Sequence, residues 1–200
     1  IIEMYINDIH ILTYLITGII GLIVGQFIDW CNLRLPDYKK VFSKEFFSEY
    51  LKNCRTKYLL MVIVALLYIA LLYLNGLTLY TVKFMLLIPM IIIAFIIDFK
   101  SQIIPNRLNL TIFEVGLVFA FLYGLSNVAI TINMLLGMVA GAGIFLLITL
   151  LEGAFYGKEA MGFGDVKLMG ALGLYFGLSN IVVITLISFL IGAILSIGLL

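Results

Sequence analysis

Apolar residues recur along the chain in long runs separated by polar connections, a pattern typical of membrane crossings. A helix needs about 20 apolar residues to cross the hydrocarbon core of a bilayer. Seven runs come near that length, at 11–29, 58–75, 79–97, 108–125, 130–151, 166–178 and 181–200. The sixth run is short, which suits a helix that begins in an opened segment around a site. We therefore predict an all-α, polytopic transmembrane helical bundle of about seven spans.

The composition excludes a water-soluble globular domain. Of the 200 residues, 64% are hydrophobic and 12% are charged, whereas soluble domains are roughly half apolar and a quarter charged. Membrane lipid is therefore expected to surround most of the surface. The net charge of +1 says little about partners. No GxGxxG or Walker pattern is present, so we expect no nucleotide or nucleic acid as a partner.

The charge of the polar connections predicts the orientation. Lysines and arginines gather in the connections at 30–57, 98–107 and 152–165 and just beyond the last of them, at Lys167; Lys83 is the exception. Because basic connections stay on the cytoplasmic side, we place these three in the cytoplasm and the N-terminus outside. The protein is accordingly expected in the cell (inner or cytoplasmic) membrane.

The first cytoplasmic connection is predicted to hold an amphipathic helix at 37–52. Aromatic residues recur there every four positions among lysines and glutamates, which is typical of a helix lying on the inner leaflet. These aromatic residues are Tyr38, Phe42, Phe46 and Tyr50. A helix that binds a partner is the alternative. Trp30, which follows the first span, is expected to anchor the chain at the membrane interface.

Small residues and one proline predict how the helices pack. Several glycines stand four residues apart, a spacing that lets helix backbones approach closely in lipid. The pairs are Gly21 with Gly25, Gly137 with Gly141, and Gly173 with Gly177. Pro89 lies inside the third span, where it is expected to bend the helix and to free one backbone carbonyl.

Two aspartates stand at the cytoplasmic ends of predicted spans, where an ionisable group needs an explanation. Asp98 ends the third span and Asp165 opens the sixth, so both are expected at the same depth on the same face of the bilayer. If their helices are neighbours, the two carboxyl groups share a proton, since like charges at short range resist joint ionisation. One then acts as general base on a water and the other as acid toward a carbonyl, the chemistry of aspartic proteolysis.

Glycines and a proline surround these acids. Gly162 and Gly164 precede Asp165 and are expected to adopt backbone angles that other residues avoid, so that an extended peptide can approach the backbone. Pro105, after Asp98, is expected to delay the next helix and to fix the turn of its loop. For each aspartate alone, the alternative is a helix-end residue satisfied by water, with Asp165 as an N-cap. The two together favour the catalytic interpretation.

Three segments of the chain resemble the type IV prepilin peptidases, a family of GxGD aspartic proteases. "GFGDVKL" at 162–168 resembles the family's GxGDxKL signature. "DFKSQIIPN" at 98–106 resembles its first motif, an Asp followed by a basic residue and then Ile-Pro-Asn. "GQFIDWCNLRLP" at 25–36 is similar to a third, N-terminal element, from which Gln26 and Asp29 depart. The three segments occur in the family's order, and the resemblance covers most of the chain.

The resemblance implies both a site and a substrate. Asp98 and Asp165 correspond to the catalytic pair of a membrane aspartic endopeptidase, and the motif residues around them support it. The supporting residues are Gly162, Gly164, Lys100, Pro105, Asn106 and Lys167. The implied substrates are type IV prepilins or pseudopilins, whose leader peptide is cut after a glycine at the cytoplasmic face.

The resemblance is incomplete in the first cytoplasmic connection. Bacterial members often carry two CxxC pairs that bind zinc there, whereas this connection has Cys54, with Cys31 at its start. With no CxxC pair, no metal site is predicted. Many members also methylate the new N-terminus from S-adenosylmethionine; we expect no cofactor for proteolysis, and methylation that is weak or absent. Bacterial members have one further span, and the chain stops inside an apolar run, so we expect it to be truncated at its C-terminus.

The remaining polar residues leave alternatives open. Lys100 and Lys167 either reach toward the membrane interface or hold charge near the acids. Glu114, in the fourth span, either lines the active cavity or pairs with a neighbour such as Asn109. Asp29 is a third acid at the cytoplasmic end of a span and competes for a catalytic role.

Two other functions stay as alternatives. A proton-coupled transporter would use Asp98, Asp165 and Glu114 as a relay. A non-catalytic membrane subunit would assemble through its glycine faces, and a homo-oligomer is an open possibility for the peptidase as well. We divide the chain into 1–57, the first span with a reduced cytoplasmic connection, and 58–200, the peptidase membrane domain with both aspartate motifs.

Overall fold

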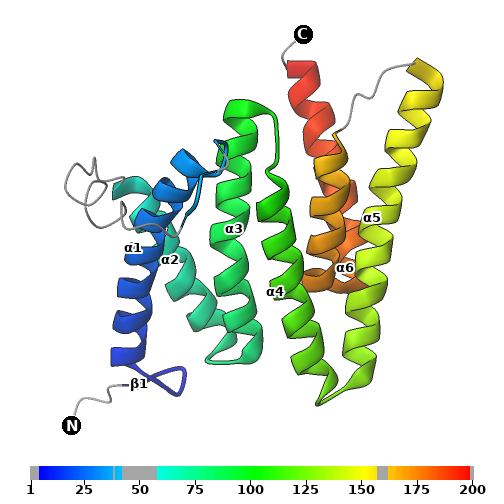
Figure 1. Ribbon diagram of the computed structural model, residues 1–200. Helices are drawn as coiled ribbons and strands as arrows, with labels where there is room; N and C mark the ends of the chain where they lie inside the picture. The colour runs from blue at the N-terminus through cyan, green and yellow to red at the C-terminus, as the bar shows by residue number, and fades with distance from the viewer. Residues whose placement is uncertain (1–4, 38, 42–57, 157–161, 199–200) are drawn as a thin grey trace. The chain divides into compact units, whose positions relative to one another are not determined.

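A computed structural model describes residues 5–37, 39–41, 58–156 and 162–198, and most of these lie in helices (Figure 1). Among them are six helices long and apolar enough to cross a membrane. They are α1 (Ile11–Arg34), α2 (Tyr58–Asn75), α3 (Leu79–Ser101), α4 (Asn106–Gly124), α5 (Val128–Tyr156) and α6 (Phe163–Gly198). A short hairpin of β1 (Tyr5–Ile6) and β2 (Ile9–His10) precedes α1. The prediction of an all-α, polytopic membrane bundle is confirmed, and α1 to α5 each begin within two residues of their predicted span.

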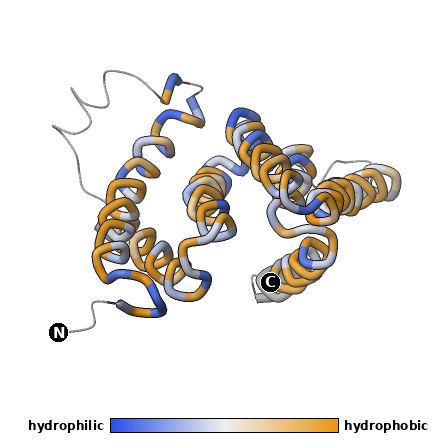
Figure 2. Tube along the Cα trace, turned by 90° about the horizontal axis from the view of Figure 1, so that it is seen from below, coloured by the Kyte–Doolittle hydropathy of each residue, from blue (hydrophilic) through white to orange (hydrophobic). Residues whose placement is uncertain are grey.

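Hydrophobic residues predominate along the helices, and hydrophilic residues gather near the turns and helix ends (Figure 2). In every one of the six helices, at most 33% of the apolar window is buried inside the protein. Helices that are apolar all round and largely uncovered need lipid as their surroundings. The helices thus have the surface expected of membrane spans.

The chain forms two compact units, Ile1–Pro105 and Asn106–Leu200. The boundary falls between α3 and α4, immediately before the first residue of α4. The first unit contains the β-hairpin with α1, α2 and α3, and the second contains α4, α5 and α6. The predicted division into 1–57 and 58–200 is a functional one, and it stays a prediction.

In the first unit, α1 and α2 pack with their backbones in close contact. A Cβ atom on Gly21 would lie 2.5 Å from the Cα of Ala65, and one on Gly25 would lie 2.5 Å from the Cα of Met61. Neither position accepts a larger side chain without separating the helices. The prediction that this glycine pair serves helix packing is confirmed, and the pairing of 21 with 65 and 25 with 61 shows that the two helices are antiparallel.

Pro89 lies inside α3, as predicted. Its ring nitrogen has no hydrogen, so the carbonyl of Met85, four residues earlier, loses its usual helical donor. The hydroxyl of Tyr68, a buried residue of α2, donates to that carbonyl instead, at 2.5 Å. The freed backbone group is therefore satisfied by a neighbouring helix, which is how proline is tolerated inside membrane helices.

Two residues of the first unit lie in surroundings that the sequence does not reveal. Lys83, the exception to the charge pattern, is buried on α3 with its ammonium 4.9 Å from the ring centre of Phe84, a cation–π contact. Trp30 is not the interface anchor expected, because it is 5% exposed and its indole N–H donates to the carbonyl of Val41 at 2.8 Å.

The predicted helix at 37–52 falls almost entirely outside the described residues.

In the second unit, α6 is broken at Gly177 and turns back on itself. Gly177 has φ 72° and ψ 176°, which interrupts the helix, and Figure 1 shows the stretch after it running back beside the stretch before it. The neighbours along α5 agree: a Cβ on Gly141 would contact both Met169 and Ile181, which lie on either side of the break. The amide of Leu178 donates to Oδ1 of Asn133 on α5 at 3.2 Å, which caps the restarted helix.

The break changes the predicted count of spans. The predicted runs at 166–178 and 181–200 form one element, α6, so the described residues contain six long apolar helices in place of seven. The reversal lies at Gly177, two residues before the predicted separation of the runs at 179–180. The patterns are correct about the turn, but a single glycine makes it without any polar connection.

Candidate active site

Asp165 lies in the first turn of α6, which begins at Phe163. Its amide donates to the carbonyl of Gly162 at 3.0 Å, and the residue is half-buried. It is therefore inside the helix, and the alternative of Asp165 as an N-cap does not describe it. A carboxylate in the first turn faces the positive end of the helix dipole, which favours its negative charge.

The backbone just before Asp165 is held from α4. The Nδ2 of Asn109 donates to the carbonyl of Gly164 at 3.0 Å, across 55 positions of sequence. Asn109 is 3% exposed, and no described residue donates a hydrogen bond to its Oδ1. A buried carboxamide whose nitrogen is hydrogen-bonded while its oxygen is not is unusual, because buried polar atoms nearly always have partners. Asn109 did not pair with Glu114, which is exposed.

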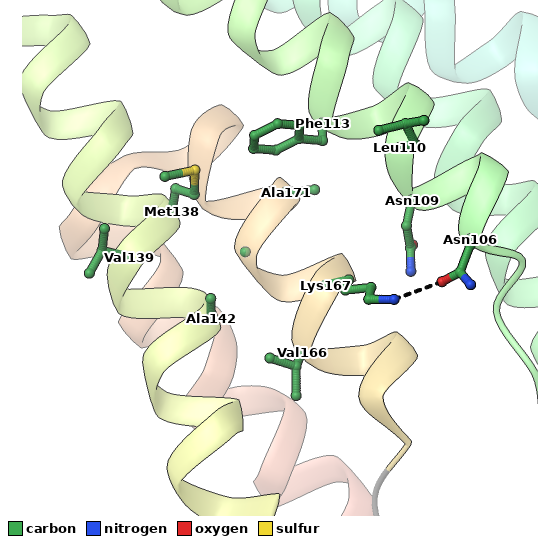
Figure 3. Close-up of a pocket in the computed structure, with 11 residues that line it drawn as sticks. Asn106, Asn109, Leu110, Phe113, Met138, Val139, Ala142, Val166, Lys167 and Ala171 are labelled. Atoms are coloured by element: carbon green, nitrogen blue, oxygen red, sulfur yellow. Dashed lines mark hydrogen bonds between the residues drawn. The ribbon is translucent and has the colours of Figure 1, made fainter.

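A second bond joins the same two helices one turn away. The ammonium of Lys167, two residues after Asp165, donates to Oδ1 of Asn106 at 3.0 Å. Figure 3 shows Lys167 reaching from α6 to Asn106, with Asn109 on the next turn of α4. Lys167 therefore binds an amide oxygen of the other motif segment, a contact that neither of its predicted alternatives includes.

These groups line one end of a cleft of about 690 Å³ enclosed by α4, α5 and α6 (Figure 3). Its polar lining consists of Asn106, Asn109 and Lys167, and the rest is apolar or glycine. The other lining residues are Leu110, Phe113, Met138, Val139, Ala142, Val166, Gly170 and Ala171. An apolar cleft with a few convergent polar groups is the usual form of a binding site, and Val166 and Lys167 place it directly beside Asp165 in the chain.

Asp98 lies in the last turn of α3, and its side chain is exposed. Its carbonyl accepts the amide of Gln102 at 2.7 Å, where Gln102 ends the helix in the left-handed conformation. Lys100 is exposed on the same turn. Pro105 is buried and α4 begins at the next residue, so the proline stands where the sequence predicts, at the limit of the loop.

The two aspartates belong to different units, and their meeting stays a prediction. Within the first unit, the antiparallel order of the helices places Asp98 at the end where α1 finishes and α2 begins. Within the second unit, Asp165 lies at the end where α4 begins and α5 finishes. Asp29 is half-buried near the C-terminal end of α1, in the same unit as Asp98.

The glycines before Asp165 act differently from the prediction. Gly162 and Gly164 do not have positive φ; the glycines that do, among the described residues, are Gly76 and Gly177. The space around Gly162 is nevertheless open, since the atom nearest to a Cβ built there is Oδ2 of Asp165 at 3.8 Å. The backbone can therefore be approached at this point, but not because of an unusual conformation.

The described residues hold no group of three histidine, cysteine, aspartate or glutamate side chains placed to bind a metal ion. Sequence reasoning named Asn109 as a partner for Glu114 and missed its place in the site. A signal for it exists, because Asn106 and Asn109 stand three apart in a run that is otherwise largely apolar, which puts both on one face of a helix.

Residues 85–197, which include both aspartate motifs, match the type IV leader peptidase family. The chain belongs to this family. The type IV leader peptidase match begins inside α3 and ends near the end of α6, so it includes the whole second unit apart from its last residues and the part of the first unit that carries Asp98.

Similar proteins from three bacteria carry one name, prepilin leader peptidase/N-methyltransferase. Those of Aeromonas hydrophila, Pectobacterium carotovorum subsp. carotovorum and Escherichia coli (strain K12) are 35%, 34% and 35% identical to this chain. The aligned segments cover 57%, 64% and 48% of this chain and 39%, 45% and 42% of the relatives. The chain therefore spans less than half the length of these relatives. No solved structure matches it.

Proposed function

We propose that this chain is the membrane aspartic endopeptidase of its family and that it removes the leader peptide of type IV prepilins or pseudopilins. The observation that carries this proposal is the placement of Asp165. The acid stands in the first turn of α6, next in the chain to Val166 and Lys167, which line a mostly apolar cleft, and the backbone before it is open at Gly162 and bonded to α4 at Gly164. Family membership favours neither a transporter nor an assembly subunit.

The mechanism uses two carboxyl groups that share one proton. Asp98 and Asp165 form the pair; the ionised member takes a proton from a water while the protonated member donates to the carbonyl of the scissile bond. The attack of the water forms a new carbon–oxygen bond, and the leaving amine takes up a proton as the carbon–nitrogen bond breaks. We place this reaction at the cytoplasmic face because the basic connections belong there by the positive-inside rule.

The test is cleavage by the purified full chain in detergent. A prepilin or pseudopilin substrate is incubated with the protein, and the released leader is identified by mass spectrometry. A single cut after a glycine supports the proposal. A protein that is folded, as judged by its helical circular dichroism and its unfolding transition, and leaves every such substrate intact would contradict it.

A further inference from the structure

Asn109 has a property that holding the catalytic turn does not explain. Its Nδ2 is used, because it donates to the carbonyl of Gly164. Its Oδ1 is buried, and no described residue donates to it. A structural bond to Gly164 needs a donor only, and a serine hydroxyl offers one without burying an unpaired carbonyl oxygen. The unused oxygen belongs to a residue that lines the cleft, as do Val166 and Lys167, the residues that follow Asp165 in the chain.

The hydrogen-bond donor for this oxygen would come from a ligand bound in the cleft. Its lining offers no other buried side-chain acceptor among the described residues, because Oδ1 of Asn106 already accepts from Lys167. A peptide bound along the cleft brings a main-chain N–H with every residue, and each of these must find an acceptor once water is excluded. An amide oxygen fixed through its own Nδ2 is a well-oriented acceptor for such a group.

We propose that Asn109 is a substrate-positioning residue: its Nδ2 fixes the backbone that precedes Asp165, and its Oδ1 accepts one main-chain N–H of the bound peptide. This inference rests on the proposed peptidase function. The two arms of one planar carboxamide then set the distance between the peptide backbone and the turn that carries Asp165. Because Oδ1 of Asn109 is covered in the unbound protein, the peptide reaches it only after side chains at this end of the cleft move aside. The Lys167 side chain, which crosses this end of the cleft to Asn106, is long and flexible enough to do so.

The proposal is tested with peptide substrates in which one amide at a time, around the cleavage site, is replaced by an ester. An ester keeps the shape of the chain and removes one N–H. In the wild-type protein we expect one ester position to lower kcat/KM about fivefold to tenfold, the effect of one lost hydrogen bond in a dry site. In Asn109→Leu, which has no acceptor, the same ester should have no further effect.

Two more variants separate positioning from simple structural support. Asn109→Ser keeps a small polar side chain but lacks the carboxamide oxygen, so it should also lose the ester effect, even if Asn109→Leu does not fold. Thr111→Val is the matched control, because Oγ1 of Thr111 donates to the carbonyl of Arg107 at 2.9 Å on an exposed part of α4. It should show the same ester sensitivity as the wild type.

Each outcome decides the proposal. Ester sensitivity at one position that disappears in both Asn109 variants supports it. Esters that lower kcat/KM equally in the wild type and the Asn109 variants show that Asn109 acts through Gly164 alone, and a wild type insensitive to every ester shows that no peptide N–H is bound; either result overturns it. Failure of the wild type to cleave the all-amide peptide is a different result, since it contradicts the peptidase function itself.

Discussion

The hydroxyl of Tyr68 on α2 donates a hydrogen bond to the main-chain carbonyl of Met85 on α3. In an uninterrupted helix that carbonyl would accept the amide of residue 89, but Pro89 has no amide hydrogen. Tyr68 on α2 thus supplies the hydrogen-bond donor that Pro89 removes from α3. A backbone acceptor that lipid cannot satisfy receives a donor from outside its own helix.

This relationship predicts a non-additive pair of mutations. Tyr68→Phe should lower the free energy of unfolding by about 1 kcal/mol, the range measured for interhelical hydrogen bonds in membranes. In a Pro89→Ala background the new amide at 89 serves Met85, so Tyr68→Phe should cost much less. The double-mutant cycle is measured by denaturation in mixed micelles. An equal cost in both backgrounds would show that the hydroxyl and the proline are independent.

Replacing Asp98 or Asp165 should abolish cleavage. Asp98→Asn and Asp165→Asn should each reduce kcat by at least about 10³-fold while the protein still inserts in the membrane, because an amide serves as neither acid nor base. Single-turnover cleavage by purified protein measures the loss, and the unfolding transition confirms the fold. Near-normal cleavage by either variant would rule out an aspartic mechanism.

The glycines before Asp165 should matter for activity more than for stability. Gly162→Val is expected to fold, since the nearest atom to a Cβ at 162 is 3.8 Å away, yet the added bulk stands where a peptide approaches the backbone. Gly164→Val is expected to lower activity for the same reason. Gly173→Val is the contrast, because its Cβ would meet the main chain of Gly137; it should lose stability first. Normal cleavage by Gly164→Val would contradict this role for the glycines.

The break in α6 predicts a costly substitution at Gly177. A side chain at φ 72° and ψ 176° is strained, typically by about 1–3 kcal/mol, and its Cβ would lie 2.5 Å from Nδ2 of Asn133. Gly177→Ala should therefore lower the melting temperature. Gly143→Ala on α5 is the control, because a Cβ there meets no atom within 4 Å, and it should leave stability unchanged or raise it. Similar melting temperatures for the two variants would argue against the break.

Cleavage should need no metal, and N-methylation should be weak or absent. Two carboxyl groups activate the water without a cation. In the segment related to the family's N-terminal element, the described polar groups bind the chain itself: Arg34 donates to the carbonyl of Lys40 at 3.0 Å, and Trp30 donates to that of Val41. Purified enzyme is assayed with a chelator and labelled S-adenosylmethionine. Loss of cleavage under chelation would contradict metal-free cleavage. Stoichiometric label on the new N-terminus would contradict weak or absent N-methylation.

The helices could be predicted from the sequence because the bilayer imposes one length and one polarity on every span. α2 agrees with its predicted range at both ends, and the glycines of α1 pack as their spacing indicates. The position of Asp165 in a first turn also follows from its place between glycines and an apolar run. Each of these depends on neighbours in sequence or on a regular repeat.

What could not be predicted depends on contacts between distant segments. The bond from Asn109 to Gly164 joins residues 55 positions apart, and no local pattern indicates which carbonyl an asparagine will bind. The count of spans differs by one because the two last predicted runs belong to one element, α6, in which Gly177 alone reverses the chain. Trp30 was misplaced because its partner, Val41, lies in a connection with no regular repeat.

The helices around the cleft are joined by contacts of unequal stiffness. α5 meets α6 through main-chain atoms at Gly137 and Gly173, with no side chain between them to yield. α4 meets α6 largely through side chains, including the carboxamide of Asn109 and the hydroxyl of Tyr175, which donates to the carbonyl of Ile112 at 2.9 Å. A cleft built this way has one rigid wall and one compliant wall. A bulky ligand is therefore expected to displace α4 more readily than α5, and because Asn109 on α4 bonds the carbonyl of Gly164, that displacement also acts on the turn that carries Asp165.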